Sequence, residues 1–400
     1  MTMAADKQDK VLNVPTLRFP EYSDKWLECE LQDIADLSKG AGISKDQLSE
    51  MGESCILYGE LYTKYKSEVI SNVVSKTDIE STNLVRSKAN DVIIPSSGET
   101  AIDISTARCV PYDNILLGGD LNIIRLKNQD GRFFSYQLNG MRKLDIAQIA
   151  QGVSVVHLYG ESLKRLKVRY PSKSEQEKIS SLMSVIDERI ETQIRIIEDL
   201  KSLSDVICEC LYTPSEKESW QTYKYTNLFS ISNERNSKLQ YTNVLSASQE
   251  YGMIERNELN IDIKFEASSI TNYKIVRPNQ YVIHLRSFQG GFAYSEKTGV
   301  CSPAYTILVP NEKLSTAFLK YYFTSKKFID SLRIVTYGIR DGRSISVEEF
   351  LQLKVAIPVI TRQQHIVQVM QLWEEKIRTE EEYLSKLQQQ KKYLLSSMFI

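Results

Sequence analysis

The chain has 400 residues, which suits two or three domains, and its 42% hydrophobic and 25% charged residues are typical of a globular protein. Its net charge of −1 combines an acidic segment, residues 1–160 (17 basic, 22 acidic, net −5), with a basic one, residues 216–345 (17 basic, 12 acidic, net +5). The acidic segment argues against a strong grip on DNA there, whereas the basic one is compatible with nucleic-acid binding.

Several classes of protein are disfavoured by simple patterns. No apolar run is long enough to span a bilayer, and the first ten residues lack the apolar stretch of a secretory signal. The six cysteines form no CxxC pair, so we expect free thiols in a reducing compartment. We therefore expect a cytoplasmic protein.

The first 160 residues predict a loose tail and an α/β domain. We interpret residues 1–15 as a flexible tail and residues 16–160 as the first domain. Short apolar runs typical of strands occur at residues 92–94, 115–117 and 121–124.

Residues 161–213 contain a long amphipathic helix. Apolar residues recur there at the alternating spacing of four and three that marks the contact face of a coiled coil, which we call the seam. Gln193 and Ser204 are polar breaks in this seam. Its other residues include Ile179, Met183, Ile186, Ile190, Ile197 and Leu200.

Residues 214–346 predict a second α/β domain. Strand-like runs occur at residues 281–283 and 305–309, and Pro310 closes the second of them. Residues 314–332 then carry apolar side chains at helical spacing, so we expect one helix there.

Residues 347–400 repeat the first long helix at a constant offset of 187 residues. The offset carries Pro171 to Pro358 and then holds without a gap to the C-terminus. The polar breaks of the second seam, Glu380 and Lys391, match those of the first. Its other residues include Ile366, Met370, Trp373, Ile377, Leu384 and Leu387.

The two seams predict that the helices pair with each other. The first helix leaves the first domain and the second must run back, so the pair is antiparallel, with a seam of roughly 50 Å at about 1.5 Å per residue. Gln193 is then expected near Lys391, and Ser204 near Glu380. Asp187 and Glu374 fall on outward faces, which are either solvated or face partner subunits. Buried polar positions of this kind can fix the register of a coiled coil.

The expected fold class is therefore α/β (α+β), with two globular domains separated by an antiparallel two-helix coiled coil and related by a pseudo-twofold internal repeat. Inside the domains the repeat is weaker, as in the match of Trp26 with Trp220. A duplication with two altered recognition faces and a drifting structural duplication both fit this divergence.

Candidate contact residues in the first domain lie in two segments. Residues 62–66 interleave aromatic and basic side chains, which suits a surface that faces phosphates, although surface tyrosines are common. Residues 95–100 form a small, polar loop that lets the backbone approach a phosphate closely, and a plain polar turn fits equally well. The candidates are Tyr62, Lys64, Lys66, Ser96, Ser97 and Gly98.

Candidate contact residues in the second domain lie in two glycine-bearing loops, residues 284–291 and 339–344. Arginine can donate two hydrogen bonds to guanine, glutamine can pair with adenine, and serine suits a phosphate or a base edge. The alternatives are a structural turn for the first loop and a lead-in to a helix capped by Ser346 for the second. The candidates are Arg286, Ser287, Gln289, Arg340 and Arg343.

The sequence shows no catalytic constellation. The three histidines are far apart and no cysteine pair accompanies them, so no metal-site spacing occurs. A P-loop, a GxGxxG turn after a strand and a GxSxG elbow are all absent from the sequence. We therefore expect a binding protein that has no catalytic residue and no metal site and is not an enzyme.

The doubled order of a variable α/β domain and a helix that opens with proline and glutamine resembles the specificity subunits of type I restriction–modification systems. Residues 171–179, PSKSEQEKI, are similar to the P-x-x-x-E-Q-x-x-I element of that family. Residues 358–366 are its second copy, with Arg362 in place of the glutamate.

Further segments carry the same resemblance. Residues 17–20, LRFP, followed by Trp26, resemble the opening of that family, and residues 286–291 with residues 302–305 resemble one of its target-recognition domains. The resemblance extends from about residue 16 to residue 400. It rests on the doubled order more than on any single motif.

The resemblance implies a function in DNA recognition. Each α/β domain would be a target-recognition domain that reads one half of a bipartite, asymmetric site in double-stranded DNA. The helices would act as a spacer and dock two methyltransferase subunits, and endonuclease/translocase subunits would join the complex. S-adenosylmethionine, ATP and Mg would be bound by these partners alone, and this chain would hold no cofactor, perform no chemistry and contact no membrane.

Two other classes of function stay open. One is a coiled-coil scaffold that arranges protein partners without DNA, and salt-dependent duplex binding by the complex with its methyltransferase would distinguish it. The other is an enzyme with a shallow site between the domains, for which turnover by the isolated chain is the test.

Overall fold

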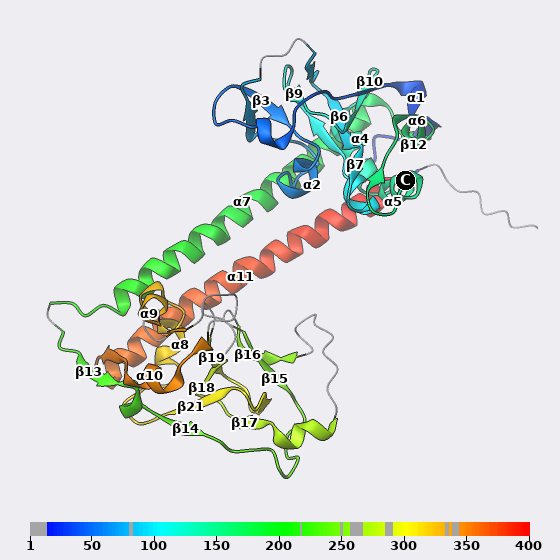
Figure 1. The fold of residues 1–400 in the computed structure, drawn as a ribbon. Helices are drawn as coiled ribbons and strands as arrows, with labels where there is room; N and C mark the ends of the chain where they lie inside the picture. Colours follow the sequence, from blue (N-terminus) through cyan, green and yellow to red (C-terminus); the bar gives the residue numbers. More distant parts are fainter. Residues whose placement is uncertain are drawn as a thin grey trace, which may run out of the picture. The chain divides into compact units, whose positions relative to one another are not determined.

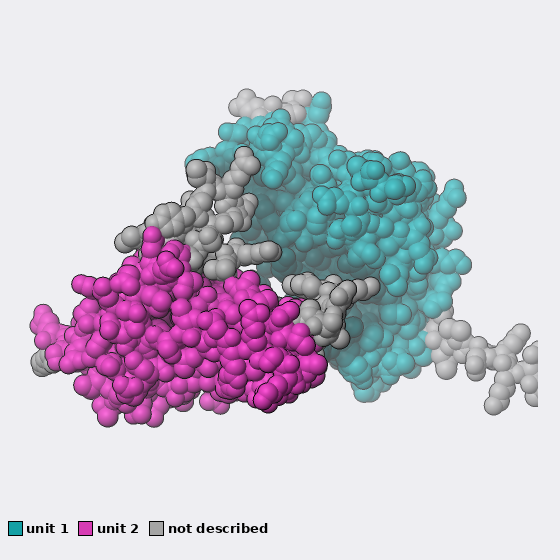
Figure 2. Space-filling view, turned by 60° about the horizontal axis from the view of Figure 1, so that its bottom comes forward, with its two compact units in different colours: residues 1–194, 382–400 teal, residues 195–381 magenta. Residues whose placement is uncertain are grey.

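The computed structural model describes residues 14–79, 83–216, 218–248, 251–256, 267–284, 291–332, 336–337 and 344–400. The chain divides into two compact units, coloured teal and magenta in Figure 2. Unit 1 comprises residues 1–194 and 382–400, and unit 2 comprises residues 195–381. Each unit contains one α/β domain and one part of each of two long helices (Figure 1).

The domain of unit 1 is built on a four-stranded antiparallel sheet in the order β2-β10-β6-β8. A second four-stranded sheet has the order β4-β3-β9-β5, and β1 pairs with β12 and β7 with β11. The strands are β1 (Leu27–Glu30), β2 (Ala35–Lys39), β3 (Glu53–Ile56), β4 (Ser75–Thr77), β5 (Val85–Arg86), β6 (Asp91–Pro95), β7 (Ser97–Gly98), β8 (Arg108–Val110), β9 (Leu116–Leu117), β10 (Leu121–Leu126), β11 (Val156–His157) and β12 (Lys167–Tyr170). The helices are α1 (Leu31–Ile34), the 3₁₀ helix η1 (Lys45–Gln47), α2 (Glu60–Thr63), α3 (Ala101–Ile104), α4 (Gly131–Asn139), α5 (Lys143–Ile149) and α6 (Gly160–Lys164).

The domain of unit 2 repeats this frame with the sheet order β14-β21-β18-β19. Pairs β13-β24, β15-β16, β17-β20 and β22-β23 accompany it. The strands are β13 (Gln221–Lys224), β14 (Phe229–Ser232), β15 (Leu245–Ser248), β16 (Gly252–Glu255), β17 (Lys274–Val276), β18 (Gln280–Ile283), β19 (Phe292–Ser295), β20 (Gly299–Cys301), β21 (Thr306–Pro310), β22 (Thr336–Tyr337), β23 (Ser344–Ile345) and β24 (Lys354–Ile357). The helices are the 3₁₀ helices η2 (Tyr225–Asn227) and η4 (Ala267–Asn272), and α8 (Phe318–Tyr322), α9 (Lys326–Leu332) and α10 (Val347–Gln352).

The central strand β6 carries three consecutive buried apolar residues, 92–94, because both of its faces are covered. Val92 and Ile94 point into the core that contains Trp26, whereas Ile93 between them points into a second core. Strand β18 of unit 2 has the same arrangement, with Tyr281 on one side and Val282 on the other. A continuous apolar run is the pattern expected of a strand buried on both faces.

The predicted strands are all present, but the helix predicted over residues 314–332 is wrong in one respect. The structure breaks it into α8 and α9, and Ala317 before α8 has a left-handed backbone (φ 61°). The break turns the chain so that Phe323 and Phe328 pack on each other, with ring centroids 4.5 Å apart. The burial of these two aromatic rings in one core therefore determines where the helix breaks, which the helical spacing of apolar residues does not indicate.

The long helices α7 (Lys173–Leu211) and α11 (Ile360–Met398) each have 39 residues, and their bounds differ by the predicted offset of 187 at both ends. They run antiparallel within each unit. In unit 1 Asp187 meets Lys391 at 2.7 Å, and the earlier Met183 shares a core with the later Met398. In unit 2 Lys201 meets Glu381 at 2.7 Å, and the later Cys208 shares a core with the earlier Met370. The predicted fold class is therefore confirmed. All twelve predicted seam residues are buried or half-buried.

One interpretation of the helix faces is wrong. Asp187 was expected on an outward face, either solvated or facing a partner subunit, but its side chain is 9% exposed and lies against the domain of unit 1. Its partner is Lys391, the polar break of the second seam. None of the helices formed by the described residues is both long and apolar enough to cross a membrane.

Candidate nucleic-acid interface

A buried glutamine fixes the start of each long helix to its α/β domain. In unit 1 the amide nitrogen of Gln176 donates to the carbonyl of the proline five residues earlier (2.9 Å), and the Asp130 N–H donates to its oxygen (3.0 Å). In unit 2 Gln363 donates to the equivalent proline (2.9 Å) and accepts from the Ser315 N–H (2.8 Å). The proline–glutamine element of the sequence is therefore a clamp between helix and domain, since a buried amide without partners costs about 1–3 kcal/mol.

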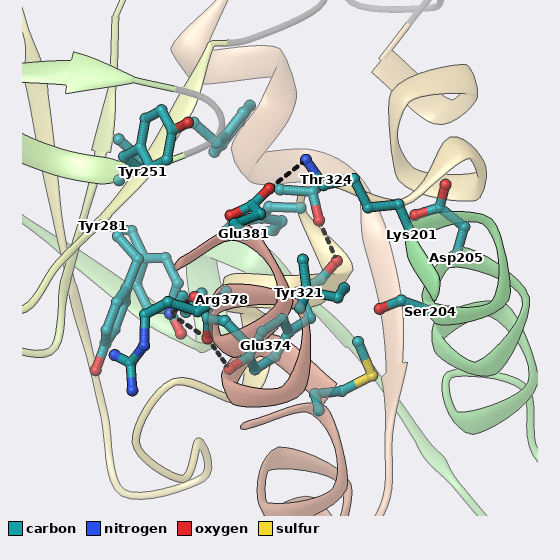
Figure 3. A pocket seen from close by; sticks show the side chains of 18 residues that line it. Lys201, Ser204, Asp205, Tyr251, Tyr281, Tyr321, Thr324, Glu374, Arg378 and Glu381 are labelled. Carbon is teal, nitrogen blue, oxygen red and sulfur yellow. Dashed lines mark hydrogen bonds and ion pairs between the residues drawn. The ribbon is translucent and has the colours of Figure 1, made fainter. Parts of the chain in front are cut away.

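A tyrosine–carboxylate hydrogen bond forms a second fixed contact in both units. The Tyr136 hydroxyl on α4 donates to Asp187 Oδ2 on α7, and the Tyr321 hydroxyl on α8 donates to Glu374 Oε2 on α11, each at 2.7 Å. Burial, together with the nearby carboxylate, raises the pKa of both tyrosines above the usual range, so both hydroxyls stay protonated donors. Sequence reasoning placed both carboxylates on outward faces and missed these two hydrogen bonds, although the offset of 187 relates Asp187 to Glu374. The second bond lies at the wall of the pocket drawn in Figure 3.

The cation that neutralises this carboxylate differs between the units. In unit 1 Lys391 Nζ lies 2.7 Å from Asp187 Oδ1 and also hydrogen-bonds to Glu68. Burial lowers the pKa of Lys391, but the two carboxylates outweigh it and the pKa is raised. In unit 2 Lys320, next to the tyrosine on α8, donates to both Glu374 oxygens at 3.0 Å. Unit 1 therefore uses a lysine from the long helix, and unit 2 one from the domain.

The ion pair at the start of each long helix has opposite polarity in the two units. In unit 1 Arg18, ahead of the first strand, makes two hydrogen bonds of 2.7 Å to Glu175, whose side chain is 1% exposed. In unit 2 the position of that glutamate is Arg362, whose Nε lies 3.0 Å from Glu218 Oε1 without hydrogen-bond geometry, and both side chains are 32% exposed. Both pairs connect the entry of a domain to its long helix.

The predicted contact residues 62–66 lie on and after α2. Tyr62 is half-buried, and burial raises the pKa of its hydroxyl. Lys64 Nζ is held by Glu60 (2.6 Å) and the Ser75 hydroxyl (2.9 Å). Lys66 is exposed, and its ammonium donates only to the Thr63 carbonyl (3.1 Å) among the residues described, which leaves it free to meet a phosphate.

The predicted contact residues Ser96, Ser97 and Gly98 lie at the end of β6 and in β7. Both serine side chains are buried (5% and 8% exposed), and the Ser96 N–H donates to the Asp120 carbonyl (2.7 Å). A Cβ on Gly98 would lie 2.5 Å from a methyl carbon of Ile104, so this position has no room for a side chain. The segment supports the adjacent backbone, and its role in DNA contact stays a prediction.

An exposed hairpin lies beside this segment. Residues 151–157 close through an isolated bridge between Gln151 and His157, and β11 pairs with β7. Val153 at the tip is 96% exposed, and the His157 and Tyr159 rings stack at 6.1 Å. No pattern in the sequence indicates that the tip of this hairpin is exposed.

The predicted contact residues of the second domain, Arg286, Ser287, Gln289, Arg340 and Arg343, lie outside the described residues. His284, which opens the first of these loops, is half-buried, and its N–H donates to the Gly291 carbonyl (2.8 Å). Strands β22 and β23 flank the second loop. The Ser346 hydroxyl after it accepts from the Glu349 N–H (3.3 Å), so the predicted helix cap is confirmed.

Each unit exposes three apolar side chains at matching positions of the long helices. The offset of 187 relates the members of the two sets pairwise, and all six are at least 40% exposed. The set of unit 1 is Val185, Tyr383 and Tyr393, and the set of unit 2 is Leu372, Ile196 and Val206. Contiguous apolar patches mark protein interfaces, and their recurrence at matching positions makes these side chains candidates for such a contact.

In the part of the chain that the structure describes, no three His, Cys, Asp or Glu side chains are grouped so that they could hold a metal ion. The contacts above instead describe two matched frames with different loops. Such an arrangement lets each unit present its own loops on a shared frame.

Comparison with known proteins identifies a family. The model for the type I restriction modification DNA specificity domain matches residues 23–202 and again residues 217–389. The structure is similar to the type I restriction–modification S subunit from M. genitalium, with a TM-score of 0.59 and 17% identity over 97% of this chain and 99% of that one. It is also similar, with a TM-score of 0.59 and 12% identity over 94% of this chain and 97% of the other, to a chain from a study of complex assembly and conformational transition of the type I R-M system.

Proposed function

Because the chain belongs to the type I restriction modification DNA specificity family, we propose that its two α/β domains each read one half of a bipartite, asymmetric site in double-stranded DNA. The observation that carries this proposal is that the frames match while the loops differ. Sheet order, glutamine clamp and tyrosine–carboxylate contact recur in both units. The candidate loops do not recur: residues 95–100 of the first domain have the sequence PSSGET, and residues 284–291 at the matching position of the second have HLRSFQGG.

Electrostatics supports different roles for the two domains. The second segment is basic and its candidate loops carry arginines, which suit direct contact with guanine. The first segment is acidic, so its binding to DNA depends on exposed cations such as Lys66 and on partner subunits that complete a basic clamp.

The experiment that tests half-site reading uses the complex of this chain with its methyltransferase and maps methyladenine across a genome. Arg286→Ala is expected to relax or abolish recognition of one half-site and to leave the other unchanged, with a cost of about 1–3 kcal/mol for a lost bidentate base contact. Lys66→Ala is the comparison, since losing a phosphate contact weakens binding uniformly and lowers the salt dependence. Unchanged methylation at both half-sites in Arg286→Ala would refute that assignment.

The long helices in this proposal serve as a spacer and as docking surface for two methyltransferase subunits. Two matched sets of exposed apolar side chains, one in each unit, support docking of two copies of one partner, because equivalent surfaces bind equivalent partners. Deleting one heptad from each helix is expected to change the gap tolerated between the half-sites and not the bases that are read.

The docking role is tested by matched variants in the two units. Val185→Asp and Leu372→Asp occupy equivalent exposed positions, so each is expected to remove one methyltransferase copy, and the double variant both, as measured by native mass spectrometry. Glu188→Gln, on an exposed polar position of α7, is the control. Full assembly in the double variant would show that the partners bind elsewhere.

The chemistry of the complex belongs to the partners in this proposal. Methyltransferase subunits carry S-adenosylmethionine, and the endonuclease/translocase subunits use ATP and Mg. The isolated chain is expected to bind duplex DNA weakly and to turn over no substrate.

A further inference from the structure

A β-hairpin occupies the same place in the frame of both α/β domains. In unit 1 it follows α5 and closes where Gln151 bridges His157, and in unit 2 it follows α9 and closes where Tyr337 pairs with Ser344. The first members of these pairs are 186 residues apart and the second members 187, so the loop of unit 2 is one residue longer. A short helix, α6 or α10, then leads into the last strand of the domain, β12 or β24. The two hairpin loops are therefore equivalent elements.

The sequences of the two loops differ in their chemistry. Residues 338–343 have the sequence GIRDGR, contain the DNA-contact candidates Arg340 and Arg343, and lie outside the described residues. Residues 152–156 have the sequence GVSVV and contain no charged side chain. One element of the frame thus carries arginines in the second domain and valines in the first, as two different recognition surfaces on one frame require.

The tip of the unit 1 hairpin has a defined backbone and points its valines into solvent. Gly152 has a backbone φ of 127°, and a Cβ on it would lie 2.1 Å from the Val155 carbonyl oxygen, so only glycine fits this turn. Val153 is 96% exposed and Val155 54% exposed, whereas Val156 is buried and pairs with Gly98 of β7. The hairpin is therefore anchored at its base while its tip stays open for contact.

The side chains at the tip determine which part of a DNA duplex it fits. Valine has no hydrogen-bond donor or acceptor, so it does not read the polar groups of a base edge. The major groove admits a two-stranded β-ribbon, and the apolar group that a base pair presents there is the 5-methyl group of thymine. Glu99, exposed directly after β7, repels phosphates and disfavours a contact with the DNA backbone at this place. The hairpin therefore suits a thymine edge.

We propose that this hairpin enters the major groove of the half-site that the first domain reads, and that Val153 recognises thymine through contact with its 5-methyl group. The inference rests on the proposed function, because it names the residue and the base chemistry of one of the two half-site contacts. It also assigns the reading role in this domain to the exposed tip and not to Ser96 and Ser97, whose side chains are buried.

The test uses the chain in complex with its methyltransferase and a duplex that carries the site found by methyladenine mapping. Each thymine of both half-sites is replaced in turn by deoxyuridine, which lacks only the 5-methyl group, and the dissociation constant is measured at fixed salt. For the natural chain, one or two replacements within a single half-site are expected to weaken binding about three- to tenfold, as the loss of one buried methyl group does.

Variants of the tip connect this loss of affinity to Val153. Val153→Ala shortens the side chain and is expected to reduce the effect of deoxyuridine to less than about twofold, as two partners of one contact behave in a double-mutant cycle. Val153→Thr keeps a methyl group and is expected to retain the effect. Val359→Ala, the same change at a 69% exposed position of unit 2, is the control and should leave every effect of deoxyuridine unchanged.

The outcomes separate this inference from the proposed function. A complex that has no sequence-specific site refutes both. A bipartite site at which deoxyuridine has no effect, or the same effect in Val153→Ala as in the natural chain, refutes the inference alone. If Val153→Ala instead prevents assembly with the methyltransferase in native mass spectrometry, the hairpin binds a protein and the inference is overturned.

Discussion

The two units have the same frame, but they stabilise it differently. Unit 1 buries its charges: Glu175 is 1% exposed beneath Arg18, and Lys391 is 16% exposed between Glu68 and Asp187. Unit 2 leaves the equivalent charges half-exposed, with Glu374 52% exposed and Arg362 32% exposed. Buried ion pairs are costly to break from one side, whereas exposed pairs contribute little. The same substitution should therefore have unequal effects in the two units.

The largest difference is expected at the lysine that meets the tyrosine-bound carboxylate. Lys391→Met leaves two buried carboxylates without their cation and is expected to lower the free energy of unfolding of unit 1 by about 4–5 kcal/mol. Lys320→Met, the matched change in unit 2, should cost less than about 1 kcal/mol because Glu374 is exposed to water. Urea unfolding with hydrogen exchange resolved by unit measures both, and equal losses would contradict the comparison.

A smaller difference is expected at the helix starts. Glu175→Gln breaks a buried pair with two hydrogen bonds and is expected to destabilise unit 1 by about 3 kcal/mol. Arg362→Gln in unit 2 should cost less than about 1 kcal/mol, since its pair is half-exposed and lacks hydrogen-bond geometry. Thermal unfolding of the two variants side by side checks the order, and an inverted order would show that exposure does not govern the two pairs.

The glutamine clamp is a point at which the two units have the same buried hydrogen bonds, so equal effects are expected there. Gln176→Leu and Gln363→Leu remove equivalent hydrogen bonds from equally buried sites. Each substitution should therefore lower the free energy of unfolding of its unit by about 1–3 kcal/mol, and the two losses should be similar. Denaturant unfolding provides the measurement. If only one of the two variants lost stability, the clamp would have the same geometry in both units but would stabilise only one of them.

The last expected effect appears only at alkaline pH and concerns the titration of Lys391 and Tyr136. The folded pKa of both groups is raised, so their contribution to stability is complete below the unfolded pKa values of about 10 and is lost as the pH rises through the folded ones. Unit 1 is therefore expected to lose stability above about pH 10, and Lys391→Met should lose less over the same range. Parallel pH profiles for the natural chain and this variant would argue against a role of the lysine in the loss.

The sequence predicted those parts of the fold that depend on local periodicity. Apolar residues at four-three spacing define a helix face whatever the partner is, so the seams and the shared bounds of α7 and α11 follow directly. The strands at β6, β10 and β18 follow from short apolar runs for the same reason.

The candidate site was less predictable, because the partner of a polar side chain depends on contacts distant in sequence. The hydroxyls of Ser96 and Ser97 suggested an open phosphate loop, yet the packing of β6 and β7 buries them. Lys64 and Lys66 look equivalent in the sequence, but only the position of Glu60 on α2 leaves one paired and the other exposed.

The sequence by itself determined that this protein is a doubled α/β frame on two matched antiparallel helices, because repeats and periodicity are properties of neighbouring residues. Only the tertiary structure decided that Asp187 is buried and bound to Lys391, whereas the matching Glu374 of unit 2 is half-exposed and paired with Lys320. The physical reason is distance along the chain: Lys391 and Glu68 are 323 residues apart, and no local pattern records which carboxylate a lysine will meet once the chain has folded.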